Sequence, residues 1–262
     1  MGHREIYTNP PLALTVVELR HTASPSLSET DKAGLKSLLA STFPIYKPAQ
    51  QVNITVTNAG ASEDRAVYPR YMTRDFTEAI TFRDNAIVVE TTRYKRRSAL
   101  RELLHQAVEA RQKVSAVDGI ERLGIRYVNE VRVPDLEHPS DWERWISAPL
   151  TGISSLRTED LAAQTWHGMT VFGTSSVGVA LRHGTFEGYA VEPAGDLRRH
   201  TPPPGAFYLL DLDSYWVPEG DIPQLDWSNI EERFNAVGLS AYELFQQLIT
   251  DRYRTEVLKR EQ

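Results

Sequence analysis

The sequence predicts an α+β protein in which long helices cover an antiparallel sheet. Residues 76–82 and 87–92 are apolar segments joined by the turn residues Arg83-Asp-Asn85. So short a connection makes neighbouring strands antiparallel. From Ser98 to Val117 apolar residues recur at helical spacing, which predicts a helix of about 20 residues and roughly 30 Å, long enough to cross a sheet.

A second observation is a segment that occurs twice. Residues 86–94 and 207–215 are each an apolar run that meets a carboxylate and ends on a tyrosine. A polar loop and a long amphipathic stretch follow both copies. The recurrence favours two pseudo-repeated halves, 1–120 and 121–262, within one continuous domain. True duplication and a chance recurrence of an α+β order both stay open.

The first half is expected to begin with a strand at Leu12–Leu19, rich in Leu, Val and Thr, with both faces partly buried. A helix is predicted around Asp31–Thr42, ended by Pro44. Gln51–Thr57 alternates polar and apolar residues, which predicts a strand with one face on a core. Residues 58–64 follow it as an expected surface loop.

The second half opens on the clearest alternating segment of the chain, Arg122–Pro134. A short helix capped by Ser140 or Asp141 is expected after it, and two further strands with glycines in or near them. The last predicted elements are a proline-containing loop and an amphipathic helix. These expected elements are the strands 169–173 and 177–182, the loop 195–205 and the helix 240–258.

Composition limits the classes of function. Of 262 residues, 41% are hydrophobic and 24% charged, as in soluble globular proteins. The formal charge of −6 disfavours a protein that coats nucleic acid. There is no cysteine, no signal-like apolar stretch at the start and no run long enough to cross a bilayer. We expect a cytoplasmic protein that does not bind membranes.

No motif predicts catalysis. The seven histidines lack the i, i+4 spacing of a helical zinc site, and P-loop, dinucleotide and nucleophile-elbow patterns are missing. No catalytic residue, metal or cofactor is therefore predicted. His21, at the end of a core strand, is the one histidine worth following. Glu90 and Asp211 with Asp213 end apolar runs; pairing with arginines explains them better than acid/base chemistry or a Mg²⁺ or Ca²⁺ site.

Three features favour contacts with another protein or with a second copy. Arg93, Lys95, Arg96 and Arg97 form a basic run just before a helix, where an anion would also be favoured, whereas the equivalent connection in the second half is acidic. Trp142 and Trp145 are candidate anchors, since tryptophan is enriched in interface hot spots. Pro203 lies in the loop expected to be mobile or in contact.

The alternative is a small-molecule-binding protein or an unfamiliar hydrolase with a pocket between sheet and helices. Polar residues on otherwise apolar strands would line it, because an unpaired polar group there is costly. Those residues are Glu18, Arg20, Tyr127, Asn129 and Asp211. A third interpretation, nucleic-acid binding through the basic run, is the least favoured because the chain is acidic.

Several segments occur together along the chain: Asn9-Pro-Pro-Leu12 with Glu18, Arg122-Leu-Gly-Ile-Arg-Tyr-Val-Asn129, Leu210-Asp-Leu-Asp213 and residues 245–251. In order and spacing they resemble a sporadically distributed family of uncharacterised prokaryotic proteins of about this length. The resemblance covers nearly the whole chain, but Asn235-Ala-Val-Gly238 stands where the family would have a histidine. A patchy distribution implies horizontally moved genes, often linked to defence, phage or toxins. We therefore expect a non-enzymatic interaction component or inhibitor of such a system.

Overall fold

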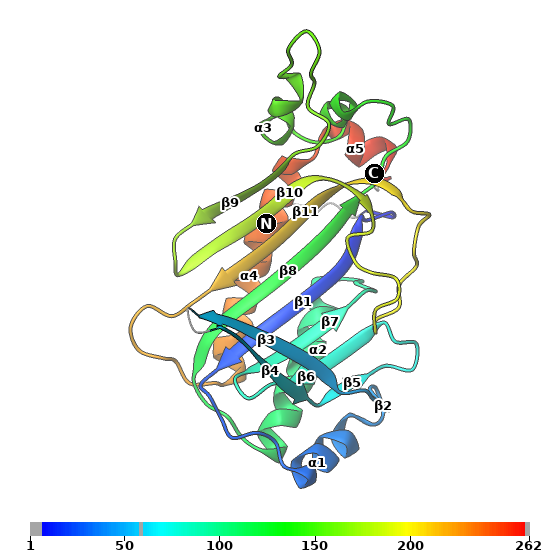
Figure 1. Cartoon of the computed structure of the whole chain (residues 1–262). Coiled ribbons are helices and arrows are strands. Elements are labelled where there is room, and N and C mark those ends of the chain that lie inside the picture. The colour runs from blue at the N-terminus through cyan, green and yellow to red at the C-terminus, as the bar shows by residue number, and fades with distance from the viewer. Residues whose placement is uncertain (1–6, 58–59, 260–262) are drawn as a thin grey trace.

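Nine antiparallel strands form one twisted sheet that runs through the whole protein (Figure 1). The structure is a computed structural model and describes residues 7–57 and 60–259, with side chains except within 52–64. The strand order is β2-β5-β6-β7-β1-β8-β11-β10-β9. The predicted α+β class with an antiparallel sheet is confirmed.

The large sheet is built from strands of both halves: β1 (Leu12–His21), β2 (Ile45–Tyr46), β5 (Arg70–Met72), β6 (Glu78–Phe82), β7 (Ala86–Thr91), β8 (Ile120–Val131), β9 (His167–Gly173), β10 (Val177–Gly188) and β11 (Gly205–Trp216). The helices are α1 (Glu29–Leu39), α2 (Arg97–Val114), α3 (Ala148–Thr151), α4 (Trp227–Leu248) and α5 (Asp251–Glu256), with short 3₁₀ turns η1 (Pro139–Arg144) and η2 (Gly152–Ser155).

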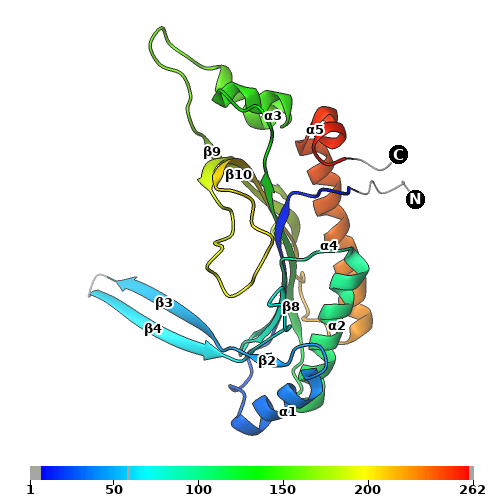
Figure 2. The same cartoon turned by 90° about the vertical axis from the view of Figure 1, so that its right-hand side faces the viewer.

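The long helices cover only one face of the sheet. In Figure 2 the sheet is seen nearly edge-on, with α1, α2, α4 and α5 on one side of it. β1 shows the reason, because its odd-numbered residues, such as Val17 and Leu19, are fully buried, whereas Glu18 is only partly buried and Arg20 is exposed. Successive side chains of a strand point to opposite faces, so the fully buried set of β1 lies under the helices and the less buried set, which ends in Glu18 and Arg20, lies on the other face.

β1 and β8 lie side by side at the centre of the nine-stranded sheet. On each side of this pair, three strands follow in the reverse of their order along the chain. β1 is flanked by β7, β6 and β5, and β8 by β11, β10 and β9. Each half thus consists of a central strand, a connecting segment outside the sheet centre, a meander of three strands and a long helix. This shared order does not show a duplication, which stays a prediction. The largest core cluster contains Val17 and Leu104 of the first half together with Ile125 and Phe234 of the second.

A two-stranded arm projects from the sheet. β3 (Ala49–Thr57) pairs only with β4 (Gly60–Tyr68), as a separate sheet. The predicted strand at 51–57 is confirmed. The prediction that one of its faces lies on a core concerns side chains outside the described part. The loop predicted over 58–64 is wrong from Gly60 onward, because residues 60–68 pair one by one with β3; residues 58–59 lie outside the described part.

Two helix predictions need correction. The last long helix begins at Trp227, well before the predicted residue 240, because the Asp226 carboxylate accepts a hydrogen bond from the Asn229 amide and caps it. It ends at Leu248, and α5 is separate. The short 3₁₀ turn at 139–144 has His138, not Ser140 or Asp141, as its N-cap residue. Asp141 lies inside the turn, and its carboxylate accepts hydrogen bonds from the backbone amides of Glu137 and His138.

No helix within the described residues combines the length and the apolar character that crossing a bilayer requires.

Candidate functional site

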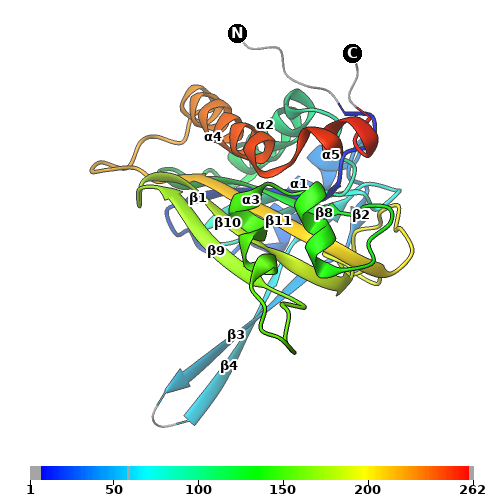
Figure 3. The same cartoon turned by 90° about the horizontal axis from the view of Figure 1, so that it is seen from above.

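The face of the sheet opposite the long helices is bordered by three projecting segments. The β3–β4 arm, the connection 189–204 between β10 and β11, and the connection 156–166 before β9 all rise on that side (Figure 2). Seen from above, the arm points away from α2 and α4 (Figure 3). We call this side of the sheet the open face.

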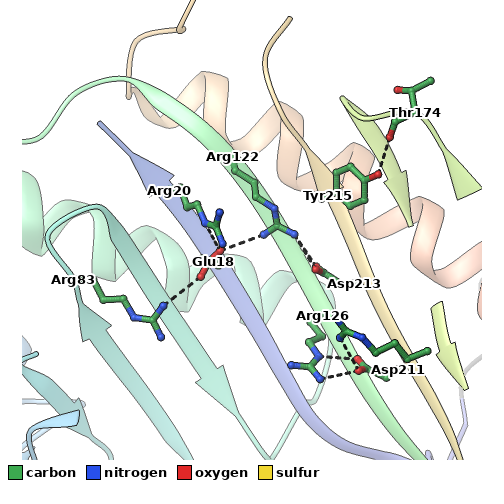
Figure 4. A network of polar contacts seen from close by, with 10 residues as sticks. Glu18, Arg20, Arg83, Arg122, Arg126, Thr174, Asp211, Asp213 and Tyr215 are labelled. Carbon is green, nitrogen blue, oxygen red and sulfur yellow. Dashed lines mark hydrogen bonds and ion pairs between the residues drawn. The ribbon is translucent and has the colours of Figure 1, made fainter. Parts of the chain in front are cut away.

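Two neighbouring ion-pair clusters, here together named the arginine ladder, cross the middle of the open face (Figure 4). Glu18 of β1 pairs with Arg20 at 2.7 Å, Arg122 at 3.3 Å and Arg83 at 3.5 Å. Arg122 also reaches Asp213 at 2.9 Å. The ladder therefore links the β6–β7 turn, β1, β8 and β11.

Asp211 of β11 is the carboxylate of the second cluster. Its carboxylate accepts two hydrogen bonds of 2.7 Å from Nε and Nη2 of Arg126, a bidentate pair. Arg182 of β10 lies 3.5 Å away. The Asp211 side chain is only 3% exposed, whereas those of Arg126 and Arg182 are 44% and 52% exposed. The carboxylate is enclosed, and the guanidinium groups present their outer edges to solvent.

Cations outnumber anions in the ladder. Five arginines, Arg20, Arg83, Arg122, Arg126 and Arg182, share three carboxylates, Glu18, Asp211 and Asp213, a formal charge of +2. The whole chain carries −6. The open face is thus locally positive on an acidic protein, and charged surfaces of this kind attract groups of opposite sign.

The connection 189–204 is fastened to the open face. Glu130 of β8 accepts hydrogen bonds from Arg132 Nε at 2.8 Å, from the Ala190 amide at 2.8 Å and from Arg199 Nη2 at 2.7 Å. Leu197 is buried against Met72 and Ala79. The contacts hold the middle of the loop, and the expectation of a mobile loop is not supported at these residues. Pro203, near its end, is exposed.

The two candidate tryptophan anchors lie in the core, which corrects their assignment to a contact surface. Trp142 and Trp145 are each 2% exposed and pack with Leu210 and Tyr253 in a second apolar cluster. A helix-like spacing put both on one face, but that face turns inward. Among the basic residues, Arg93 is 62% exposed and pairs with Asp75 at 3.2 Å.

The five predicted pocket residues divide between the two faces of the sheet. Glu18, Arg20 and Asp211 belong to the arginine ladder. Tyr127 and Asn129 lie under the helices and line a pocket of about 300 Å³ there. The Asn129 amide donates to the Leu210 carbonyl at 3.0 Å across the neighbouring strand. A single pocket containing all five is therefore wrong.

The basic run reaches that same pocket. Its walls combine the start of β1, β8, β11, the segment before α2, and α4. The lining residues are Tyr7, Pro10, Pro11, Leu12, Tyr94, Lys95, Arg96, Arg97, Tyr127, Asn129, Leu212, Gly238, Ala241, Tyr242, Phe245 and Gln246. Within the described part of the chain they include no carboxylate, histidine, serine or threonine.

The carboxylates considered for acid/base work do not meet. β1 and β8 separate β7, which carries Glu90, from β11, which carries Asp211, and three strand spacings amount to about 14 Å. Glu90 pairs with Arg70 at 2.8 Å, so the simpler interpretation of both carboxylates as arginine partners is confirmed. No group of three or more possible metal ligands occurs among the described side chains.

His21 is fully buried, and its Nδ1 lies 2.8 Å from the carbonyl oxygen of Thr22. Burial, with a smaller effect of the Arg111 charge, lowers the pKa of His21. The histidine is therefore neutral at pH 7 and structural.

Arg122, Arg126 and Arg182 are the functional candidates that sequence reasoning missed. Arg122 and Arg126 are an even number of residues apart in one alternating strand, so the spacing alone already puts them on one face. Comparison with protein-family models and with curated proteins finds no match to this chain. The resemblance seen in the sequence stays a prediction.

Proposed function

We propose that this protein is a non-enzymatic interaction component that binds an acidic segment of another protein on its open face. The observation that carries the proposal is the arginine ladder, whose five guanidinium groups share three carboxylates. Charge complementarity sets orientation and association rate more than it sets affinity. A run of carboxylates on the partner would accept hydrogen bonds from the solvent-exposed N–H groups of these arginines.

The arm supports a macromolecular partner rather than a free anion. A two-stranded hairpin by itself is only marginally stable in water, and β3 and β4 pair with no other strand. A partner lying along the open face would contact the arm and stabilise it. Nucleic acid is disfavoured as that partner, because residues 49–68 contain one basic residue, Arg65, beside Glu63 and Asp64, and so offer few cations for phosphates.

The family resemblance supports a setting for this activity: a prokaryotic cytoplasm, with a partner from a mobile-element, phage or defence system that the protein would assemble with or inhibit. The buried tryptophans are no part of the proposed surface. The connection 189–204 borders it, with Pro203 exposed.

A labelled poly-glutamate peptide tests the charge requirement by fluorescence anisotropy. Arg20→Glu with Arg182→Glu changes two side chains that are 50% and 52% exposed on the open face. Lys113→Glu with Arg252→Glu, 61% and 47% exposed on the helix side, is the control with the same change in charge. We expect the first pair to weaken binding at least tenfold more than the second.

Hydrogen exchange locates the bound peptide. We expect slower exchange of the backbone amides of the arm and of β10 with its edge neighbour β9, and no change in α2 or α4. Equal loss of binding in both charge-reversed pairs, or protection on the helix side, would overturn the proposal. Tighter binding of a thymidine oligonucleotide of equal charge through the same arginines would show that the partner is nucleic acid instead.

A further inference from the structure

The pocket under the helices has the features of a ligand site distinct from the open face. It lies on the other side of the sheet, between α4 and the segment that leads into α2. Its volume of about 300 Å³ is at the lower end of the range for small-molecule sites. Three separate properties of its walls define what it would hold: charge at one end, aromatic sides, and an unused donor at the other end.

The charge comes from the start of α2. Lys95 and Arg96 are exposed and make no side-chain hydrogen bond or ion pair within the described part of the chain, and Arg97 is half-buried. The N-cap residue Arg96 caps no amide with its side chain, and the first turn contains no acidic residue. Cations at the positive end of a helix dipole repel it. An anion bound there would relieve that repulsion and pair with the Lys95 and Arg96 side chains.

A second hollow lies on the other side of the same basic segment, but its walls disfavour an anion. It is lined by Glu78 and Glu102 beside Arg93, Lys95 and Arg101. Burial, which outweighs the neighbouring Lys95 charge, raises the pKa of Glu78. Carboxylates repel an anion, and the pocket under the helices has none among its lining residues.

Aromatic side chains form the sides of the pocket. The rings of Tyr94 and Tyr127 meet edge to face, with centroids 6.0 Å apart and an interplanar angle of 85°. Tyr242 and Phe245 of α4 add two more aromatic rings, and Leu212 an apolar contact. Such walls favour a flat ring, which can stack or meet an aromatic edge.

Gln246 supplies the unused donor. Its Oε1 accepts from the Tyr7 hydroxyl at 2.7 Å and from Arg254 Nε at 3.2 Å. These two bonds fix the orientation of the amide. Its Nε2 is buried and has no acceptor among the described residues. Because a buried donor without an acceptor costs about 1–3 kcal/mol, the pocket is suited to a ligand that brings one.

The two polar ends are separated by a measurable length of helix. Arg97 packs on Gly238, where a Cβ would lie 3.0 Å from its Cδ, and it donates to the Asn235 carbonyl at 3.2 Å. Gln246 follows eight residues later on α4, which is about 12 Å along the axis. A ligand that reached both would have to extend over about this distance.

We propose that this pocket binds a phosphate monoester that carries a flat, hydrogen-bond-accepting ring, of which a nucleoside 5′-monophosphate has the right form. The phosphate lies against Lys95 and Arg96. The base lies against the aromatic walls of the pocket, with an acceptor toward Gln246 Nε2.

Isothermal titration calorimetry with adenosine 5′-monophosphate, adenosine and inorganic phosphate tests the proposal. We expect the monophosphate to bind at least tenfold more tightly than either part. Lys95→Ala with Arg96→Ala removes exposed cations and leaves the fold intact, and it should weaken the monophosphate tenfold or more while leaving adenosine unchanged. Lys113→Ala, at the other end of α2 and 61% exposed, is the matched control and should change neither.

The second variant addresses the ring end. Gln246→Glu replaces the donor with an acceptor and should weaken the monophosphate and adenosine alike, and thermal unfolding shows that the variant is folded. Inorganic phosphate binding as tightly as the monophosphate would refute the ring, and an unchanged affinity in the double-alanine variant would refute the phosphate position. No heat with any 5′-monophosphate would refute the site. The ladder variants Arg20→Glu with Arg182→Glu should bind the monophosphate normally, so this result is independent of the proposed partner.

Discussion

Replacing Glu130 with alanine should release the connection 189–204 and destabilise the protein. The Glu130 side chain is 3% exposed and accepts from Arg132, Ala190 and Arg199, and the Arg199 side chain is only 7% exposed. Removing one partner of a buried ion pair costs about 3–5 kcal/mol, because the other charge stays buried without compensation. Arg132 is 22% exposed and keeps its bond to the Gly205 carbonyl, so we expect about 3 kcal/mol.

For a chain of this size that loss corresponds to a fall in Tm of about 6–12 °C, at roughly 2–4 °C per kcal/mol. Differential scanning calorimetry measures it, and limited trypsin digestion reports the loop, since Arg198 and Arg199 lie within it. Cleavage there should become faster in Glu130→Ala. Glu187→Ala, an exposed glutamate at the end of β10, is the control and should leave both readouts unchanged.

Acid should remove the difference between wild type and variant. Burial, the largest single effect, raises the pKa of Glu130, but the hydrogen bonds from Ala190, Arg132 and Arg199 together outweigh it and lower the pKa below the ordinary 4.5. A lowered pKa in the folded state stabilises the protein above the unfolded-state pKa and stops doing so as pH falls through the folded value. A change in Tm below 1 °C, or a gap that stays constant as pH falls below 4.5, would refute this reasoning.

Three further changes test other parts of the structure by urea unfolding. Trp142→Ala should lower the free energy of unfolding by about 3–5 kcal/mol, because it leaves a cavity in the core. A decrease below about 1 kcal/mol would mean that this side chain lies on the surface instead. Asp226→Ala should cost about 1 kcal/mol by removing the cap of α4, whereas no loss would mean that the helix starts elsewhere. Arg111→Met should stabilise by about 1 kcal/mol or more, because Arg111 is fully buried and, among the described residues, its Nε and Nη1 have no partner while Nη2 donates to Ser24 Oγ at 3.0 Å; destabilisation would mean that the bond to Ser24 outweighs the cost of burying the charge.

The local sequence pattern predicts most helices and strands of the fold. It fails where pairing with another strand or a single capping residue decides the structure. The hairpin at β6 and β7 follows from a three-residue turn between apolar runs, and β8 from its alternation. β4 was missed because Asn58-Ala-Gly-Ala-Ser-Glu-Asp64 is rich in residues that favour turns, and pairing with β3 overrides that tendency. The early start of α4 depends on one capping residue, Asp226, and the polar loop residues before it make this cap hard to recognise in the sequence.

The candidate sites required the register between strands, which sequence alone does not contain. Tyr127 lies opposite Thr15 and Glu18 opposite Gly124, and only this pairing shows that tyrosine and glutamate face opposite sides. The arginine ladder joins residues of five segments far apart in the chain. Polar residues on apolar strands were therefore correctly singled out, but grouping them in one pocket was not possible without the topology.

The central position of β1 has a consequence for how the chain reaches its native state. Thr15 pairs with Thr91 on one side and with Tyr127 on the other, so the first strand of this sheet to be synthesised waits for both neighbours. In the second half, β9 and β10 are joined by a short turn and can pair once made, whereas β11 follows only after the connection 189–204. Non-local pairing slows folding and leaves strand edges exposed meanwhile. Nascent chains stopped shortly after α2 should therefore hold β1 with one edge unpaired, and would need a chaperone to keep it from pairing with another chain.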